Sequence, residues 1–279
     1  MTLLNESRLR QEARLRQEAV GWHDEPMAST VTVPVASAAV PVASAAVPVA
    51  SIVIPTYNQR PEYLATAING ALDQSVPVEV IIIDDGSDVP ISAKGCPPNL
   101  RIIRHATNRG ISAAINTGIA AMRSEWFAWL SSDDMIDLLK VERQVQAMVA
   151  ARCFASYHLY RLMVDDQIRG IMRQAPPWMT IEEQRPLFVR CCAMNFSTIM
   201  LHRSVILDVG GPDETYRYGQ DWEWQNRIGQ KYLFHGVERC LGTRRDRCGN
   251  LTQQLEADPE RFRIAREEDA RIRATYGVA

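Results

Sequence analysis

Two pairs of adjacent aspartates are the residues of this 279-residue chain best suited to chemistry. Asp84 and Asp85 directly follow an apolar run, and Asp133 and Asp134 come shortly after another. Carboxylates brought together away from water are costly unless a cation or hydrogen-bond donors compensate their charge. Oxygen ligands with no histidine or cysteine beside them suit Mg²⁺ or Mn²⁺, and such an ion fits a diphosphate partner. The two pairs are therefore candidates for a site that holds a divalent cation and a diphosphate.

Apolar runs typical of buried strands alternate with helical patterns through the middle of the chain. The strand-like runs cover residues 51–55, 78–83, 100–104 and 126–130, and the helical patterns cover residues 61–72, 111–122 and 138–149. This alternation predicts an α/β fold with a mainly parallel central sheet and helices on both faces. Ligands of such sheets bind at the carboxyl ends of the strands, where both aspartate pairs and the turn at Tyr57 and Asn58 are placed.

Composition argues against several classes of protein. The 31 basic and 33 acidic residues give a net charge of −2, so we expect no nucleic-acid partner. No G-x-x-x-x-G-K-[ST] loop is present, and no G-x-G-x-x-G follows the first strand-like run, which disfavours P-loop and dinucleotide-binding proteins. The six cysteines include no C-x-x-C pair and indicate reduced thiols in a cytoplasmic protein.

The first 49 residues have a different character. The unit V-P-V-A-S-A-A is repeated nearly three times from Val33, and R-L-R-Q-E-A occurs twice from Arg8. A proline in every seventh position breaks helices, and alanine and serine are too weakly apolar for a membrane span or a signal peptide. We expect residues 1–49 to be a low-complexity tail or linker without fixed structure. We expect no transmembrane segment, and peripheral association with a membrane stays open.

Six segments, in this order, resemble the family 2 glycosyltransferases of the GT-A fold. They are S-I-V-I-P-T-Y-N (51–58), I-I-I-D-D-G-S (81–87), N-R-G-I-S-A-A-I-N-T-G (108–118), W-L-S-S-D-D (129–134), G-G-P-D-E (210–214) and G-Q-D-W-E-W (219–224). The resemblance implies a glycosyltransferase domain over residues 50–252, with a nucleotide-binding N-terminal half and an acceptor-binding C-terminal half. We expect residues 253–279 to form a helical extension that packs on the domain.

The resemblance also implies a reaction. It predicts an inverting transfer of a sugar from a nucleoside-diphosphate sugar, with UDP favoured, to a hydroxyl of a glycan or lipid-linked acceptor in polysaccharide biosynthesis. The nucleotide-binding residues that it implies are Pro55, Thr56, Tyr57, Asp85, Asn108, Arg109, Gly110, Ser131 and Ser132. Three alternatives stay open: Asp85 as a turn-capping residue, Tyr57 as simple packing, and Arg109 as a surface residue at a helix start.

The implied metal motif departs from its usual form. Many relatives read D-x-D-D where this chain reads Ser131-Ser132-Asp133-Asp134, so a hydroxyl replaces the first carboxylate. We expect Mn²⁺ or Mg²⁺ to be bound by Asp133, with Asp134 as the alternate ligand. The other interpretation is that either aspartate caps the helix that follows.

The catalytic base implied by the family stands in an E-D pair at a helix start, which here reads Gln220-Asp221. We expect Asp221 to take the proton of the acceptor hydroxyl, and the helix N-terminal amides to keep Asp221 ionised. Trp222 and Trp224 are expected either to stack on a sugar or to lie in the core. Residues of the acceptor or phosphate side are Gln220, Trp222, Trp224, Arg245, Arg247, and more weakly Asn195 and Ser197.

A second departure concerns Arg247, which stands where relatives carry the histidine of an R-x-H motif. A guanidinium cannot bind a metal, but it can hold phosphate oxygens together with Arg245. Two rival functions follow from these departures and from the shared α/β core: a catalytically weak nucleotide-sugar-binding homologue, or a sugar nucleotidyltransferase. Acceptor loops are expected between residues 157 and 186, where no motif is found.

Overall fold

A computed structural model of the chain describes residues 47–93, 95–246 and 257–277. The expected tail at residues 1–49 falls outside these ranges except for its last three residues, and so does Arg247. The helices and strands belong to one unit that begins at Pro48.

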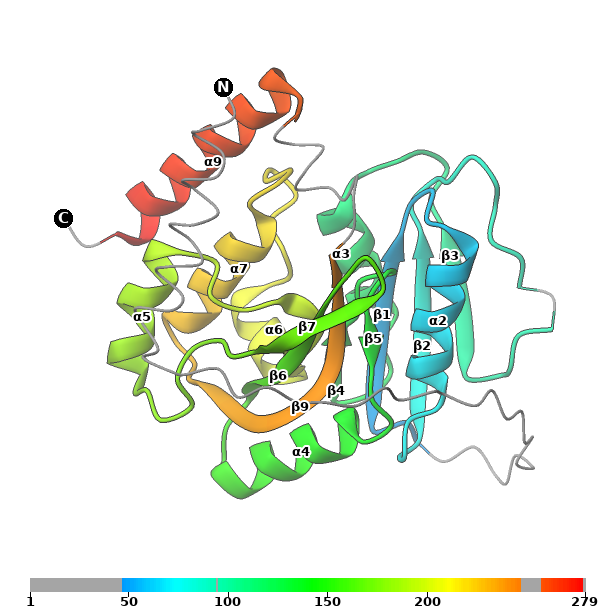
Figure 1. Cartoon of the computed structure of the whole chain (residues 1–279), viewed down its shortest axis with the longest axis horizontal. Helices are drawn as coiled ribbons and strands as arrows, with labels where there is room; N and C mark the ends of the chain where they lie inside the picture. Colours follow the sequence, from blue (N-terminus) through cyan, green and yellow to red (C-terminus); the bar gives the residue numbers. More distant parts are fainter. Residues whose placement is uncertain (1–46, 94, 247–256, 278–279) are drawn as a thin grey trace. The chain divides into compact units, whose positions relative to one another are not determined.

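Four parallel strands form the N-terminal half of the central sheet, in the order β3-β2-β1-β4 (Figure 1). The strands are β1 (Ala50–Thr56), β2 (Val78–Asp84), β3 (Leu100–Arg104) and β4 (Trp126–Trp129). Every residue of β1 and β2 is buried, as expected for strands that are covered on both faces. The expected α/β fold with parallel strands is present in this half.

Helices α2 (Pro61–Leu72) and α3 (Ile111–Ala121) cover opposite faces of these strands. Leu64 and Ala67 of α2 lie in one core cluster with Ile52 of β1, while Ile115 of α3 lies in a second cluster with Val53. Because neighbouring side chains of a strand point to opposite faces, the two clusters are on the two sides of the sheet. Gly118 lets α3 approach β1 closely, since a Cβ there would lie 2.3 Å from a methyl carbon of Val53.

The C-terminal half of the sheet is mixed. Its strands are β5 (Met135–Ile136), β6 (Ala155–Val164), β7 (Gln167–Met172), β8 (Met200–His202) and β9 (Phe234–Asp246). β8 is antiparallel to both β4 and β6, β6 is parallel to β9, and β5 and β7 are antiparallel edge partners of β9 and β6. The segment 157–186, which we expected to be loops, therefore contains most of β6, all of β7 and the start of a helix.

The remaining helices are α4 (Lys140–Ala151), α5 (Ile181–Arg190), α6 (Arg203–Val209), α7 (Gln220–Gly229) and α9 (Pro259–Tyr276), with a short 3₁₀ helix, η1 (Phe196–Thr198). α4 begins two residues later than the sequence pattern predicts, and Leu138 is 57% exposed. Asp258 caps α9 by accepting hydrogen bonds from two backbone amides of its first turn. No helix in the described ranges has the length and apolar content that crossing a membrane requires.

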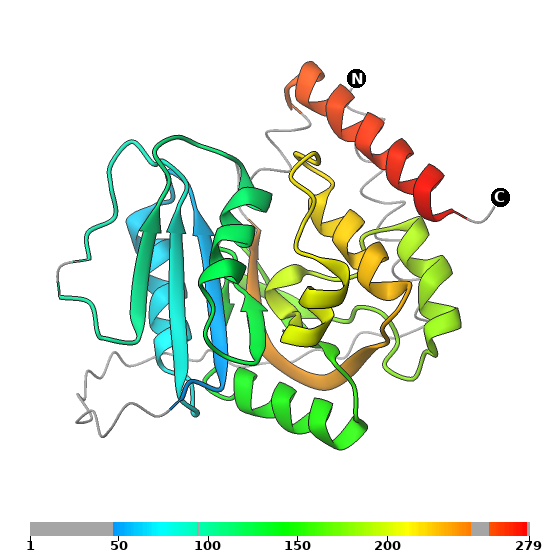
Figure 2. The same cartoon turned by 180° about the vertical axis from the view of Figure 1, so that it is seen from behind.

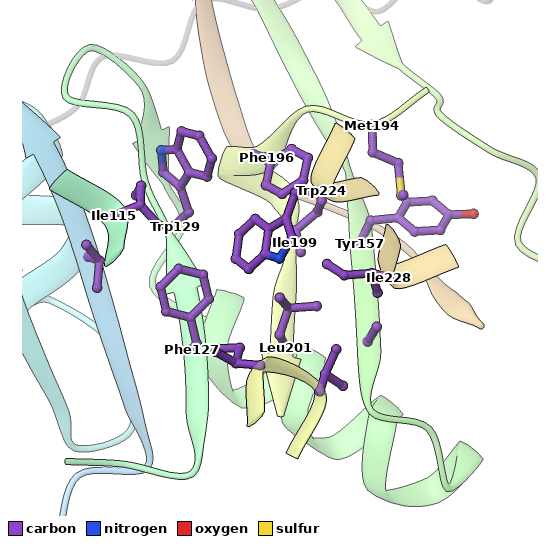
Figure 3. Packing of buried hydrophobic residues seen from close by; sticks show 14 of the residues in the cluster. Ile115, Phe127, Trp129, Tyr157, Met194, Phe196, Ile199, Leu201, Trp224 and Ile228 are labelled. Carbon is purple, nitrogen blue, oxygen red and sulfur yellow. The ribbon is translucent and has the colours of Figure 1, made fainter. Parts of the chain in front are cut away.

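One core cluster joins the two halves of the sheet, whose backbone is seen from behind in Figure 2 and whose packed side chains are drawn in Figure 3. The ring of Phe196 stacks on Trp224 of α7 with 5.5 Å between centroids, and Trp129 of β4 lies 5.1 Å from Phe196 on another side. Phe127 meets Trp224 edge-on at 5.9 Å. Each large apolar side chain that is fully buried contributes about 1.5–3 kcal/mol. The cluster therefore fixes α7 against the end of β4.

Candidate functional site

The turns after β1 and β2 are tied to each other at the carboxyl edge of the sheet. Asp85 N–H donates to the carbonyl of Thr56 at 2.9 Å, and Asn58 N–H donates to Ser87 Oγ at 3.0 Å. Asn58 adopts a left-handed backbone with φ of 47°, which allows its amide side chain to bond Asp88 in both directions. Pro55 and Thr56 are buried in β1, whereas the ring of Tyr57 is 49% exposed. Tyr57 thus presents an aromatic face to solvent at this edge.

Asp84 holds its own turn. The fully buried carboxylate accepts hydrogen bonds from Ser87 N–H at 2.9 Å and from Arg104. Burial alone would raise the pKa of Asp84, but the hydrogen bonds from Ser87 and Arg104 outweigh burial and keep the pKa below its usual value. Asp84 is therefore a structural carboxylate.

Asp85 is more constrained than the sequence indicated. Its Oδ1 accepts from Arg109 N–H at 2.9 Å and lies 2.6 Å from His105 Nδ1, and its Oδ2 accepts from Gly110 N–H at 2.8 Å. The local turn-capping role that we left open for Asp85 is filled by Asp84, whereas Asp85 accepts from the amides at the start of α3, whose N-cap is Gly110. An ionised carboxylate offers about four acceptor positions. Oδ2 accepts one of these hydrogen bonds and can accept a further donor from a ligand.

His105 is a site residue that sequence reasoning missed. It directly follows β3, and the pairing of Asp84 with Arg104 in the sheet register places it beside Asp85. His105 is 7% exposed, and its Nε2 lies 2.9 Å from Thr117 Oγ1 on α3. The imidazole therefore links the end of β2 to α3 and orients the Asp85 carboxylate. No sequence motif signals this role.

The predicted diphosphate-side turn, residues 108–110, lies at the start of α3. The guanidinium of Arg109 is 3.6 Å from Glu214, and both side chains are about half exposed. Asn116 Nδ2 also donates to Glu214 at 2.9 Å and to the carbonyl of Pro212 at 3.0 Å. These contacts bring the turn at residues 210–214 next to α3, so the N-terminal and C-terminal halves of the described domain meet here.

The second aspartate pair follows β4, and two different segments, η1 and β9, donate hydrogen bonds to Asp134. Ser197 Oγ donates to Asp134 Oδ2 at 2.6 Å, and Arg245 N–H donates to Asp134 Oδ1 at 2.9 Å. Ser131 N–H donates to Ser197 Oγ at 3.1 Å. Ser197, expected at the acceptor cleft, is thus the hydroxyl that supports Asp134.

Gln59, in the loop after β1, contacts the loop that carries Asp133 and Asp134. Its Nε2 donates to Ser132 Oγ at 3.0 Å, which joins the loop after β1 to the loop after β4. The predicted nucleotide-binding residues at the end of β1 and the predicted metal ligands therefore lie at one edge of the sheet.

Asp134 is 4% exposed, and burial, followed by the charge of Asp133, raises its pKa from 3.8 to about 6. A divalent cation between the two carboxylates would relieve this repulsion, and both offer the oxygen atoms that Mg²⁺ and Mn²⁺ prefer. Within the described ranges no group of three or more histidine, cysteine, aspartate or glutamate side chains forms a metal site. The donor set fits an ion that takes its remaining ligands from a diphosphate and water.

Two arginines of β9 reach this region. The guanidinium of Arg245 lies 4.4 Å from the ring centroid of Tyr63, pairs with Asp166 and donates to the carbonyl of Asp133 at 3.3 Å. Arg244, which the sequence did not indicate, is within electrostatic range of both Asp134 and Asp221. The charge of Arg244 therefore acts on Asp134 and on Asp221 at the start of α7.

Asp221 lies in the first turn of α7, which begins at Gln220. Its Oδ1 accepts from Trp222 N–H at 2.8 Å. We expected the helix amides to keep this carboxylate ionised, and they act in that direction together with Cys192 and Arg244. Burial outweighs them and raises the pKa of Asp221. A raised pKa brings a carboxylate closer to the range in which it serves as a general base.

The neighbours of Asp221 are buried. Trp224 has no exposed surface, and its indole N–H donates to the carbonyl of Gly210 at 2.9 Å. Trp222 is 6% exposed, and its indole N–H donates to the carbonyl of Phe188. The idea that these rings stack on a sugar is therefore wrong, and the core alternative holds. The side-chain carbonyl of Gln220, in contrast, is buried with no hydrogen-bond partner in the described part of the chain.

Comparisons with known proteins find similar sequences over much of this chain. The model of "Glycosyl transferase family 2" matches residues 51–210. A Bacillus subtilis protein named as a teichuronic acid biosynthesis glycosyltransferase, TuaG, is 26% identical over 194 residues, which cover 67% of this chain and 74% of TuaG. The Escherichia coli UDP-Glc:alpha-D-GlcNAc-diphosphoundecaprenol beta-1,3-glucosyltransferase WfaP is 27% identical over 160 residues, which cover 56% of this chain and 61% of WfaP.

Solved structures show the same fold. S. aureus TarS 1-349 in complex with UDP-GlcNAc superimposes with a TM-score of 0.61 and 15% identity, over 82% of this chain and 68% of that chain. Its complex with UDP gives a TM-score of 0.59 and 16% identity, over 81% and 64% of the two chains. Among the curated relatives the matched share varies widely, from 74% of TuaG to 13% of a glycosyltransferase of Rickettsia bellii.

Proposed function

This chain belongs to glycosyltransferase family 2 and has the GT-A fold, and from that premise we propose that it transfers a sugar from a UDP-sugar, with inversion, to a hydroxyl of a glycan or lipid-linked acceptor. The observation that carries the proposal is the position of Asp133 and Asp134. Two adjacent carboxylates stand at the carboxyl end of β4, and the burial of Asp134 beside Asp133 creates a demand for a cation. A UDP-sugar brings the diphosphate that such a cation binds.

The donor is proposed to lie along the edge formed by the ends of β1, β2 and β4. The exposed ring of Tyr57 offers a stacking face for the base, and Oδ2 of Asp85 can accept its N–H. Preference for uridine is supported by the TarS structures, which hold UDP and UDP-GlcNAc. Ser131 and Ser132 are proposed to contact the ribose as neutral hydroxyls.

The metal, Mn²⁺ or Mg²⁺, would be held by Asp133 and Asp134 and would supply charge that stabilises the UDP leaving group. Which of the two binds more directly stays a prediction. Arg245, whose backbone amide already fixes Asp134, is proposed to contribute positive charge on the phosphate side. Arg109, at the start of α3, is proposed to do the same from the opposite side.

Asp221 is proposed to accept the proton of the acceptor hydroxyl while that oxygen attacks the anomeric carbon and the sugar–phosphate bond breaks. The buried carbonyl of Gln220, which has no donor in the described ranges, is proposed to accept a hydrogen bond from another acceptor hydroxyl. The names of WfaP, which acts on a diphosphoundecaprenol-linked sugar, and of TuaG, which serves teichuronic acid biosynthesis, favour a lipid-linked or glycan acceptor and a role in polysaccharide synthesis. Such an acceptor would bring the protein to the inner membrane surface as a peripheral cytoplasmic enzyme.

The proposal is tested by thermal shift with UDP-, GDP- and dTDP-sugars, with and without Mn²⁺. We expect a UDP-sugar to raise the melting temperature in the presence of Mn²⁺, and the wild type to hydrolyse that sugar nucleotide slowly. Asp133→Asn and Asp134→Asn should lose the shift, whereas Asp208→Asn, an exposed aspartate paired with Lys231, should keep it. A metal-dependent shift without any turnover would indicate the weakly catalytic homologue instead.

A further inference from the structure

Helix α9 lies against α5 and α7, beyond the segment that the family model matches (Figure 1). Ile272 of α9 has no exposed surface and forms a small apolar cluster with Tyr216 and Trp222. The guanidinium of Arg271 lies 3.7 Å from the ring centroid of Tyr216. α9 is thus fastened to the segment that leads into α7.

A single buried carboxylate makes the central contact. Glu268 is 6% exposed, and its Oε1 accepts from Arg217 N–H at 2.7 Å. Its Oε2 accepts from Tyr218 N–H at 2.9 Å and from Gly219 N–H at 2.8 Å. Three consecutive backbone amides therefore converge on one side chain. Gly219 is the N-cap of α7 and stands two residues before Asp221.

The backbone at Gly219 packs closely against α9, in addition to its hydrogen bond with Glu268. A Cβ at Gly219 would lie 3.1 Å from Ile272 Cδ1 and 3.5 Å from Glu268, so the backbone runs directly against α9. A carboxylate at a helix N-terminus also interacts favourably with the helix dipole. These features fix the position and the direction of the first turn of α7 relative to α9.

A second contact reaches the same turn. The hydroxyl of Tyr276, near the end of α9, donates to Glu223 at 2.7 Å. Glu223 is buried and receives two hydrogen bonds of 2.8 Å from Arg227. Arg227 in turn donates to the carbonyl of Gly211, in the turn that meets α3. α9 therefore holds α7 from both ends of its first turn.

We propose that Glu268, assisted by Tyr276, is a positioning residue for Asp221, and that α9 completes the acceptor half by fixing the start of α7. The proposal rests on the proposed function of Asp221. Glu268 does not contact substrate in this scheme. It acts by holding the backbone of residues 217–219, and a base displaced by about 1 Å is enough to lower turnover strongly.

The test compares Glu268→Gln with Glu267→Gln in the full chain. Glu267 is the preceding residue of α9, but its side chain is 63% exposed and pairs with Arg263 on the surface. Hydrogen exchange of residues 215–228 reports the contact directly, and hydrolysis of UDP-glucose and UDP-GlcNAc reports turnover. We expect Glu268→Gln to speed exchange at residues 217–221 and to lower turnover roughly 10- to 100-fold, with Glu267→Gln unchanged.

UDP affinity, binding stoichiometry and the pH profile of turnover distinguish a positioning role of Glu268 from a general loss of stability. UDP affinity and stoichiometry, measured by calorimetry, should stay at the wild-type values because the donor residues are on the other half of the sheet. The acid-side midpoint of the turnover profile should move to lower pH, because water admitted beside Asp221 reduces the burial that raises its pKa, while Cys192 and Arg244 around it are unaltered. A partly unfolded sample would retain the wild-type midpoint.

Unchanged exchange at residues 217–221, or faster exchange with wild-type turnover and midpoint, would overturn the proposal. If Glu268→Gln does not fold, Tyr276→Phe, which removes one hydroxyl, should show a smaller change in the same direction, and wild-type behaviour of that variant would count against the proposal. A wild type that hydrolyses neither UDP-sugar would contradict the proposed function alone. The exchange data would still decide whether α9 holds the start of α7.

Discussion

Replacing Asp134 by asparagine distinguishes the loss of stability that this buried carboxylate causes from its proposed role in metal binding. Burial and the charge of Asp133 raise the pKa of Asp134 from 3.8 to about 6. In the unfolded chain the group ionises at its ordinary value, so above pH 6 the fold carries an ionised carboxylate that it disfavours by about 3 kcal/mol. This cost is complete above pH 6. It disappears as the pH falls from 6 towards 3.8, because the folded state then binds a proton that the unfolded state does not.

The introduced amide keeps the local geometry. Its oxygen can still accept from Arg245 N–H, and its nitrogen can donate to Ser197 Oγ, which at present donates to Asp134. The raised pKa already includes the effect of both hydrogen bonds on the charged group, but the reversed hydrogen bond must share Ser197 Oγ with Ser131 N–H, which offsets about 1–2 kcal/mol of the gain. We therefore expect metal-free Asp134→Asn to be more stable than the wild type by about 1–2 kcal/mol at pH 7.5, and the difference to shrink as the pH falls towards 4.5.

Urea unfolding at the two pH values measures this difference, with Asp208→Asn as the control for removal of an exposed aspartate. Calorimetry of UDP with Mn²⁺ measures the function, and we expect the variant to lose the metal-dependent part of the affinity. In the wild type that part should also weaken as the pH falls through 6, because protons compete for the ligand. A variant that is less stable than the wild type at pH 7.5, yet binds UDP and Mn²⁺ normally, would show that Asp134 is only a structural acceptor.

Three other substitutions test separate parts of the molecule. Asp221→Asn should lower UDP-sugar turnover by a factor of ~10²–10⁴ without changing UDP affinity, since it removes only the proton acceptor. A variant that keeps most of its turnover rate would exclude Asp221 as the base. Asp85→Asn places an NH₂ group against one of the two backbone amides that donate to this carboxylate, so we expect a loss of ~1–3 kcal/mol in UDP binding by calorimetry and a lower melting temperature. Unchanged UDP affinity would contradict the assignment. Burial lowers the pKa of Lys140 to about 7, so between pH 7 and 9 the unfolded chain holds a proton that the folded chain has lost. In urea unfolding, the free energy of unfolding of the wild type should therefore rise by about 2 kcal/mol relative to Lys140→Met over this pH range. Parallel pH profiles of the two proteins would refute this.

The sequence predicted the parallel half of the sheet well because its strands are buried on both faces. Val78–Asp84 and Ala50–Thr56 are nearly continuous runs of apolar, mostly β-branched residues, which is the pattern that this environment selects. The mixed half was missed because its strands carry polar residues in their interiors. His158 and Arg161 interrupt β6, and the pattern there indicates neither a helix nor a strand.

The site was predictable where a local pattern carries the chemistry and not elsewhere. Asp221 in the first turn of α7 and the aspartates at the strand ends follow from short motifs. The roles of His105 and Glu268 depend on partners about 20 and 50 residues away, and packing alone brings these pairs together. The burial of Lys140 could not be predicted for a related reason. Helical spacing places Lys140 beside the apolar face of α4, and its buried ammonium group donates to the side-chain amide oxygen of Gln144, which compensates part of the cost of burial.

The shared aromatic cluster of Phe127, Phe196 and Trp224 limits how this enzyme can move. Its members come from the N-terminal and C-terminal halves of the domain, and the same cluster includes Val53 of β1 and Ile228 of α7. A hinge between the halves would have to open a close-packed interior, so the two halves cannot swing as separate lobes. Adjustment to a bound donor is left to the segments above the strand ends, such as the turns at Tyr57 and Arg109. We therefore expect substrate binding to involve motion of loops and not the closure of two domains.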